Sequence, residues 1–311
     1  MCSNALDSRL RGNDTDQNKL LRRVLSYINK VITMSNNNIQ VLKADGSREF
    51  FDSGKLEQSL RRTGVSENTV NRISDHIQAE LINDMSTSDI YRHAFSLLAQ
   101  SQRGAAVRYS LRRALAGLGP SGFPFEDYMA ELFKARGWQA ETGRTFKGKC
   151  VPHEVDVVAW KKDELVMAEV KFHNELGYKT DLKVALYVKA RMDDLSGVFY
   201  NIGGSEQKLR AGYLITNTKF TETAIQYGLC AGLNLLGWNY PDKGGLEDLI
   251  EEANLHPLSC LTTLTNNEKK ELFGRGVVLC RTIVENKNIL TSLNISEQKM
   301  DEVISEASSL F

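Results

Sequence analysis

Two segments in the middle of the chain alternate apolar and polar residues with the two-residue period of β-strands. In residues 153–160, the apolar neighbours of Asp156 alternate with it, so its side chain points to the opposite face of the predicted strand. In residues 165–171, the same period places Glu169 and Lys171 together on one face. The pattern predicts two adjacent strands that direct two carboxylates and a lysine toward one spot.

Apolar periodicity on either side of these strands predicts that they belong to one mixed sheet. The segment from Phe123 to Gly137 carries an apolar stripe with helical spacing, and Glu126 lies in the first turn of this predicted helix. After the strands, the pattern predicts a helix, a strand, a helix and a strand, over residues 180–195, 211–217, 218–224 and 233–238. We therefore expect an α/β domain at residues 123–240, with a mixed central sheet and helices on both faces.

The segment 39–119 has a different pattern, in which a short hairpin precedes helices. Two alternating runs flank Asp45-Gly46, and an Asp-Gly pair between such runs is a strong hairpin signal. Serine caps and apolar periodicity then predict helices over residues 54–62, 70–82, 90–99 and 104–115. The turn-rich sequence 118–122 separates this mostly helical domain from the α/β domain.

The two ends of the chain lie outside these domains. Residues 1–38 are polar enough to form a disordered or helical leader, with one amphipathic stretch at 20–32. Met34 stands just before the first recognisable fold, and one hypothesis is that translation begins there. Residues 241–311 predict a small helical domain, with helices at 246–253, 258–264, 267–273, 278–285 and 296–310.

Composition and charge restrict the setting in which the chain works. Its 311 residues, 41% hydrophobic and 25% charged, have the composition of a globular protein. The formal net charge is +0, so any surface for nucleic acid must be local. The five cysteines are far apart and form no C-x-x-C pair, which favours reduced thiols in a cytoplasmic protein. No apolar run approaches the roughly 18 residues of a membrane span, so we expect no membrane partner.

Asp156 and Glu169 offer the ligands of a metal site. Two convergent carboxylates can hold Mg²⁺ through oxygen atoms and leave coordination positions for water and phosphate oxygens. Lys171 beside them can steady an attacking water or the negative charge that grows on phosphorus. Charges at the ends of strands are also common on solvated surfaces, so these three residues alone leave both interpretations open.

The three residues resemble the PD-(D/E)xK nuclease superfamily, in which an aspartate is followed, one strand later, by Glu-x-Lys. The order of a Phe-Glu helix, a Gly-aromatic turn, and the Asp and Glu-x-Lys strands is similar to that of Mrr-type restriction endonucleases. The resemblance implies a restriction-endonuclease-like fold in which Glu126 joins Asp156 and Glu169 at the Mg²⁺. It also implies that Lys171 is catalytic and that the substrate is double-stranded DNA, in restriction of foreign or modified DNA.

Several basic residues around these strands are candidates for contact with DNA. His153, just before Asp156, is either a phosphate contact or a packed surface histidine. Four cations in or beside the next predicted helix could follow a DNA backbone or only face solvent: Lys179, Lys183, Lys189 and Arg191.

The N-terminal domain resembles an ATP-cone, the regulatory nucleotide-binding module of ribonucleotide reductases and of a bacterial repressor of their genes. The resemblance rests on Val41, Lys43, Asp45-Gly46, Glu49–Asp52, Lys55-Leu56 and Val107–Tyr109. It implies that Val41, Lys43 and Lys55 bind ATP or dATP as an effector, since a triphosphate requires several convergent cations. Ala44 stands where the family usually has arginine, which leaves the choice of nucleotide open, and a helical module without a ligand is the alternative.

The segment Leu272–Val278 resembles the turn of a helix-hairpin-helix unit, whose backbone amides bind DNA phosphates without reading the sequence. This resemblance implies that residues 241–311 bind DNA. The alternative is a helical bundle that only packs or dimerises.

Taken together, the favoured hypothesis is a Mg²⁺-dependent DNA endonuclease regulated by ATP or dATP. A non-enzymatic, nucleotide-sensing DNA-binding regulator is one rival, and it would bind DNA without cutting it. A Holliday-junction or repair nuclease is the other, and it would apply the same chemistry to DNA chosen by shape. A single metal site cuts one strand, so a double-strand break favours a homodimer. The DNA specificity, and whether the nucleotide activates or inhibits, stay open.

Overall fold

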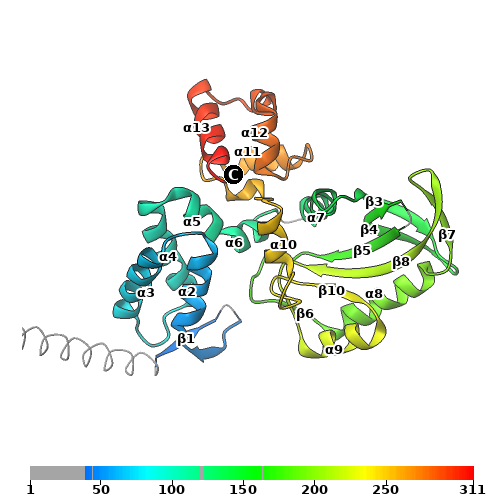
Figure 1. Cartoon of the computed structure of the whole chain (residues 1–311), viewed down its shortest axis with the longest axis horizontal. Coiled ribbons are helices and arrows are strands. Elements are labelled where there is room, and N and C mark those ends of the chain that lie inside the picture. Colours follow the sequence, from blue (N-terminus) through cyan, green and yellow to red (C-terminus); the bar gives the residue numbers. More distant parts are fainter. Residues whose placement is uncertain (1–38, 44, 120–121, 163) are drawn as a thin grey trace, which may run out of the picture. The chain divides into compact units, whose positions relative to one another are not determined.

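The computed structural model describes residues 39–43, 45–119, 122–162 and 164–311, which Figure 1 shows as a coloured ribbon. The predicted leader, its amphipathic stretch and the hypothetical start at Met34 lie outside the described residues. The described chain divides into two compact units: residues 39–61 with 65–94, and residues 62–64 with 95–311.

The smaller unit begins with the predicted hairpin. β1 (Gln40–Leu42) pairs antiparallel with β2 (Arg48–Phe50). Gly46 has a φ of 79°, a conformation that glycine adopts without steric cost. The carboxylate of Asp45 accepts hydrogen bonds from the amide and the hydroxyl of Ser47 at 3.0 and 2.6 Å. The Asp-Gly pair therefore forms the turn between the two strands, as the sequence predicts.

Helices α2 (Ser53–Arg62), α3 (Glu67–Glu80) and α4 (Thr87–Ser101) follow the hairpin. Serines cap two of them as predicted. The Ser66 side chain accepts the Thr69 amide at the start of α3, and the Ser86 hydroxyl accepts the Asp89 amide at the start of α4. Each capping serine therefore accepts a hydrogen bond from an amide that has no partner inside its helix.

The predicted helix 104–115 is broken into α5 (Arg103–Tyr109) and α6 (Leu111–Ala116). The break falls at Ser110, whose hydroxyl donates to the carbonyl oxygen of Val107 at 2.7 Å. The Ser110 amide also donates to the carbonyls of both Ala106 and Val107, so the helix tightens in its last turn. A serine that bonds to nearby carbonyls in this way competes with helix propagation.

The larger unit is built on a mixed sheet with the strand order β10-β8-β5-β4-β3. Its strands are β3 (Gln139–Lys147), β4 (Pro152–Lys161), β5 (Glu164–Lys171), β8 (Ser205–Thr216) and β10 (Asn234–Leu236). β3, β4 and β5 pair antiparallel, whereas β8 pairs parallel with both β5 and β10. β7 (Phe199–Ile202) extends β8 as a hairpin, and β6 (Lys179–Thr180) forms a short parallel pair with β9 (Lys219–Phe220).

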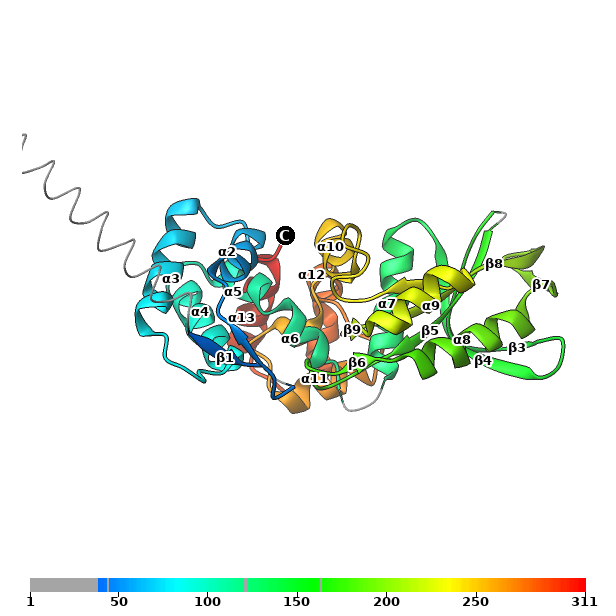
Figure 2. The ribbon, with the colours of Figure 1, turned by 90° about the horizontal axis from the view of Figure 1, so that it is seen from below.

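Helices cover both faces of this sheet, which confirms the predicted mixed α/β layering (Figure 1, Figure 2). On one face, α7 (Phe123–Ala135) packs against Val157 and Ala159 of β4. On the other, α8 (Leu182–Leu195) and α9 (Glu222–Ala231) share a core with Val158 and Met167. α9 starts later than the predicted Thr218, because Thr221 is its cap and accepts the Ala224 amide.

The C-terminal part of the chain is helical, as predicted. It comprises α10 (Leu246–Glu252), η1 (Leu258–Cys260), α11 (Asn266–Phe273), α12 (Cys280–Glu285), η2 (Lys287–Ser292) and α13 (Glu297–Ser308). The predicted helix 258–264 is reduced to the single turn η1. Its continuation is lost because the amides of Thr262 and Thr263 donate to the buried carboxylate of Glu306.

The C-terminal helices share one hydrophobic core with α7 and the sheet. This core includes Tyr128 of α7, Leu258, Leu290 and Val303. The hydroxyl of Tyr128, which is fully buried, donates to the carbonyl oxygen of Leu255. The predicted boundary at residue 241 therefore does not separate two cores. Among the described residues, no helix is long and apolar enough to cross a bilayer.

Candidate active site

Asp156 lies where β4 and β5 separate. The backbone pairing of the two strands runs from the turn to Val157 and Ala168. Just beyond this point, the Asp156 carboxylate accepts a hydrogen bond of 2.7 Å from the amide of Val170. Val170 is the residue between Glu169 and Lys171, so this bond ties the aspartate to the middle of the Glu-x-Lys sequence.

The strand alternation that predicts the direction of Asp156 is interrupted beside it. Val155 packs with Val158, whereas Val157 packs with the core on the α7 face. Strict alternation would place Val155 and Val157 on the same face. The pairing of β3 with β4 passes over Gly143 and Asp156, and Gly143 has a φ of 64°, so the regular pleat is broken at this position.

Glu169 is held by two cations. Only 3% of it is exposed, and its Oε1 accepts a bond of 2.6 Å from Nζ of Lys171. Its Oε2 pairs with the guanidinium of Arg191 on α8, which also donates to the carbonyl oxygen of Glu154. Both oxygens of the carboxylate are therefore paired with a cation, which offsets the cost of burying the carboxylate.

Arg191 is the functional residue that the sequence pattern misplaces. We expected it to face DNA or solvent, but its guanidinium is turned inward to Glu169 and is only 13% exposed. The signal in the sequence is its place beside Val188 and Met192, which form the buried face of α8. Lys189, another candidate for contact with DNA, pairs with Asp193 on the same helix.

Glu126, in the first turn of α7, interacts electrostatically with these acids. Burial raises its pKa to about 7, with further increases from the charges of Asp156, Asp127, Glu154 and Glu169. The pKa of Asp156 is raised as well, by burial and by Glu169, against the lowering effects of the Val170 amide, Lys171 and Arg191. The structure thus brings Glu126, Asp156 and Glu169 into one electrostatic cluster.

The three carboxylates do not form a closed ligand cage. Among the described residues, they are not a group whose ligand atoms all lie within 4.8 Å of one another. Glu169 is turned to its two cations and Asp156 to a backbone amide, which accounts for the separation. The donor set nevertheless fits a hard cation, because it consists of carboxylate oxygens, and the charges of neighbouring acids add to the raised pKa values of Glu126 and Asp156.

His153 and the loop before β4 are anchored by Asp194, near the end of α8. The imidazole Nε2 lies 2.8 Å from Oδ2 of Asp194, and both groups are largely buried. The amides of Cys150 and Val151 donate to the same carboxylate at 2.8 and 3.2 Å. Of the two interpretations left open for His153, the structure shows the packed histidine.

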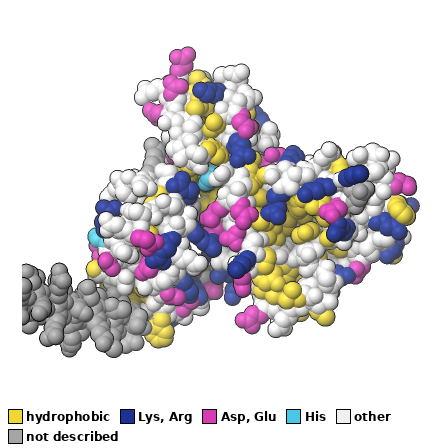
Figure 3. Space-filling view, in the orientation of Figure 1, with side chains coloured by type: hydrophobic (Ala, Val, Ile, Leu, Met, Phe, Trp, Pro, Cys, Tyr) yellow, Lys and Arg dark blue, Asp and Glu magenta, His cyan; other side chains and the backbone are white. Residues whose placement is uncertain are grey.

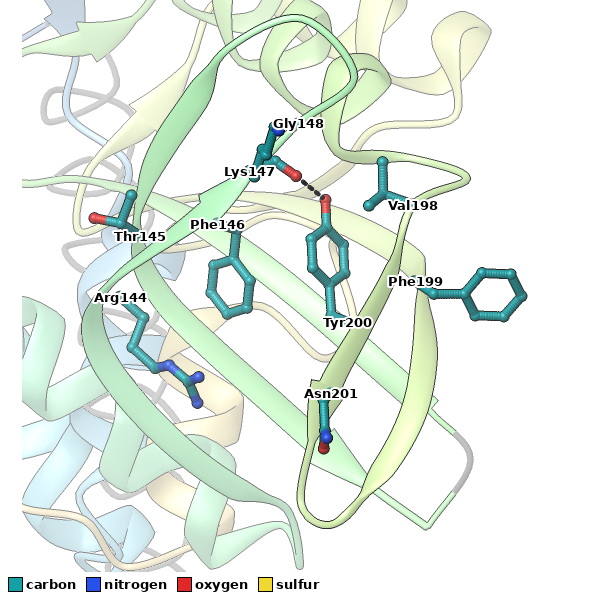
Figure 4. A pocket seen from close by; sticks show the side chains of 9 residues that line it. All are labelled: Arg144, Thr145, Phe146, Lys147, Gly148, Val198, Phe199, Tyr200 and Asn201. Atoms are coloured by element: carbon teal, nitrogen blue, oxygen red, sulfur yellow. Dashed lines mark hydrogen bonds between the residues drawn. The ribbon is translucent and has the colours of Figure 1, made fainter.

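A pocket of about 420 Å³ opens between β3 and β7, away from the acidic cluster. Its walls are residues 144–148 and 198–201, and Figure 4 shows their side chains. The Tyr200 hydroxyl donates to the carbonyl oxygen of Lys147 at 3.2 Å, and the ring of Tyr200 meets Phe146 edge-on. None of the predicted catalytic residues lines this pocket.

In the smaller unit, the structure brings together two of the three residues predicted to bind nucleotide. Nζ of Lys43 and Nζ of Lys55 lie 2.5 and 3.5 Å from the same oxygen of Glu49. Burial raises the pKa of Glu49, but the two lysines outweigh it and leave the pKa below its ordinary value. Val41 is 3% exposed and belongs to the core, and it pairs across the hairpin with Glu49, the partner of both lysines.

Comparison with known proteins identifies relatives without an assigned activity. A family model described as AF1548-like, C-terminal, matches residues 256–311. An uncharacterised protein of Archaeoglobus fulgidus is 37% identical over 180 residues, which is 58% of this chain and 97% of that protein. The crystal structure of AF1548, a protein of unknown function, is 34% identical, covers 61% of this chain and 98% of its own, and superposes with a TM-score of 0.51.

A more distant solved structure is Can2 from Sulfobacillus thermosulfidooxidans in complex with cyclic tetra-adenylate. It is 12% identical and covers 65% of this chain and 52% of its own. Its TM-score of 0.29 is too low to bear on fold or function.

Proposed function

The chain belongs to the AF1548-like protein family, and we propose that it is a Mg²⁺-dependent DNA endonuclease of the PD-(D/E)xK class whose cleavage is controlled by a nucleotide. One observation carries this proposal. The Asp156 carboxylate is bonded at 2.7 Å to the amide between Glu169 and Lys171, so the aspartate and the Glu-x-Lys sequence form one constellation. Solvated charges at strand ends have no reason to converge in this way.

In the proposed site, Asp156 and Glu169 hold the Mg²⁺ with help from Glu126. When bound, the ion would supply a water of lowered pKa and would neutralise charge on the phosphate. The ion would also relieve the repulsion that raises the pKa of Glu126 and of Asp156. Three carboxylates with two cations nearby are an ordinary environment for a divalent ion that keeps several water ligands.

In the proposed mechanism, Lys171 is the cation that lies beside the reacting phosphate. Its ammonium group is one third exposed and lies 2.6 Å from Glu169, so it is fixed in position and still open to a ligand. Such a group can orient the attacking water and stabilise negative charge in the transition state. Arg191 acts through Glu169: it bonds to the second oxygen of that carboxylate and so fixes the direction of the first.

DNA binding in this proposal uses surfaces outside the carboxylates. Figure 3 shows Lys and Arg side chains distributed over the sheet-bearing part of the molecule, which supplies local positive charge on a chain with a formal net charge of +0. In the C-terminal part, the turn from α11 to α12 contains Gly274 and Gly276, of which Gly276 has a φ of 74°. This arrangement supports the proposed helix-hairpin-helix contact with the DNA backbone.

Cleavage assays test the proposed activity. Plasmid, methylated plasmid and four-way junctions would be incubated with Mg²⁺ and either wild type, Asp156→Ala or the control Glu131→Gln, which removes a partly exposed carboxylate from α7. We expect cutting by wild type and the control only, and the substrate that is cut separates restriction from junction resolution. No cutting by wild type, or equal cutting by Asp156→Ala, would refute the proposal.

The proposed nucleotide control rests on Lys43, Glu49 and Lys55. Glu49 now neutralises both lysines, and the triphosphate of ATP or dATP would replace it with a larger negative charge. Calorimetry with either nucleotide should show binding by wild type and a loss in Lys43→Ala. The control Arg72→Ala removes an exposed cation from α3 and should bind normally. A wild type that binds neither nucleotide contradicts this part of the proposal.

A further inference from the structure

A group of metal-ligating side chains lies in the smaller unit, away from the residues of the proposed function. His76 and Glu80 are one helical turn apart on α3, and His93 faces them from α4. Each offers one ligand atom, and these three atoms all lie within 4.8 Å of one another. From this geometry we infer that His76, Glu80 and His93 form a site for a divalent transition-metal ion, and that Zn²⁺ is the ion it binds.

The separations favour a metal site over a simple hydrogen-bonded cluster. Nε2 of His76 and Nδ1 of His93 each lie 3.3 Å from an oxygen of Glu80. Charge-assisted hydrogen bonds between such groups are shorter, about 2.7–2.9 Å. Two ligands of a tetrahedral Zn²⁺, each about 2.0–2.1 Å from the metal, are about 3.3 Å apart. The distance from each ring nitrogen to its nearest Glu80 oxygen, Oε1 for His76 and Oε2 for His93, therefore equals the edge of a zinc tetrahedron.

The chemistry of the ligands selects the metal. Two imidazole nitrogens and one carboxylate suit Zn²⁺ and its neighbours in the first transition row, whereas Mg²⁺ prefers oxygen ligands alone. The two rings meet nearly edge-on, with centroids 5.0 Å apart. Three protein ligands leave the fourth position to water, and the side chains are exposed enough to let an ion enter.

The ion would fasten α3 to α4 at the connection between them. That connection, residues 81–86, also holds the hairpin: the Leu42 amide donates to Met85 at 3.1 Å, and the Asp84 amide donates to Gln40 at 2.8 Å. A metal ion that links the two helices would therefore stabilise the connection that is hydrogen-bonded to β1. Because only the folded state brings the three ligands together, metal binding and folding of this unit would be coupled.

Zinc titration of the full-length protein tests the site. Metal-free wild type would be titrated with Zn²⁺ by calorimetry in the presence of excess Mg²⁺, which keeps the proposed carboxylate site from reporting. We expect one Zn²⁺ per chain for wild type, and an affinity at least about tenfold lower for His93→Ala and for Glu80→Gln. At a free Zn²⁺ concentration of about 100 times the dissociation constant, the unfolding equilibrium constant of wild type should fall by about 100-fold.

The control is Asp75→Asn, which removes an exposed carboxylate next to His76 without touching the three ligands. It should bind Zn²⁺ as wild type does. Circular dichroism of each variant excludes misfolding as the cause of a loss, and Glu80→Gln keeps the size of the side chain. Binding by wild type that neither His93→Ala nor Glu80→Gln weakens, or no binding by wild type, would overturn the inference.

Discussion

Glu126 should make the metal-free protein less stable at neutral pH. Its pKa of about 7 in the folded state lies above its ordinary value of 4.5, because burial and neighbouring carboxylates disfavour the ionised form. Such a group contributes stability that is fully present below the ordinary pKa and is lost as pH rises through the folded-state pKa. Stability should therefore decline between about pH 4.5 and pH 7.

The magnitude follows from the size of this shift. A change from 4.5 to about 7 corresponds to about 3 kcal/mol if the full shift acts on stability. Because Glu126 is only half-buried, solvent screening reduces this to about 1–2 kcal/mol. Glu126→Gln removes the ionisation and keeps the shape of the side chain, so it should stabilise the metal-free protein by about 1–2 kcal/mol at pH 8 and by much less at pH 4.5.

Urea denaturation in EDTA at these two pH values measures the difference, with Glu131→Gln as the matched control on α7. The control should change stability little at either pH, since Glu131 is partly exposed and pairs with Lys134. In excess Mg²⁺, wild type should become more stable than Glu126→Gln, because the ion stabilises wild type more than the variant. Equal stabilisation by Glu126→Gln at both pH values, or none at pH 8, would refute the electrostatic reasoning.

Three further substitutions test contacts outside the cluster of Glu126, Asp156 and Glu169. Glu306→Gln should lower the free energy of unfolding by about 2 kcal/mol in urea, because the amide side chain cannot accept all the bonds that Thr262 and its neighbour donate. Tyr128→Phe leaves the buried carbonyl of Leu255 without this donor and should cost about 1–2 kcal/mol, measured in the same way. The pKa of Asp194 is lowered, chiefly by its hydrogen bond with His153. The ionised carboxylate therefore stabilises the folded state above the ordinary pKa of an aspartate, and this stability is lost in acid. Asp194→Asn should therefore lower the thermal midpoint at pH 7 and have less effect near pH 3.

The sequence predicts those parts of the fold that depend on neighbouring residues. The Asp-Gly turn, the Ser66 cap and the alternation of β5 residues between the two faces of the sheet are all local, and the structure contains each of them. The interruption at residues 258–264 is not local. It depends on Glu306, which lies 44 positions from Thr262 in the sequence and takes the amides that a longer helix would need.

The candidate site shows the same division. The period of two residues is enough to place Glu169 and Lys171 on one face, and the two side chains do meet. The role of Arg191 depends on how α8 packs on the sheet. Helical periodicity predicts which face of α8 is buried, but it does not predict which residue of the sheet Arg191 contacts. Likewise, the spacing of His76 and Glu80 is visible in α3, but their meeting with His93 requires the packing of two helices.

The balance of charge at the candidate site would favour binding of the proposed metal ion. Both nearby cations, Lys171 and Arg191, bond to the same acid, Glu169. Burial and repulsion from neighbouring carboxylates still raise the pKa values of Glu126 and Asp156, so both acids favour protonation. A proton and a divalent ion would relieve the same repulsion, and they would compete for the same oxygens. The arrangement that weakens the metal-free fold at neutral pH is therefore the one that would give the ion its binding energy.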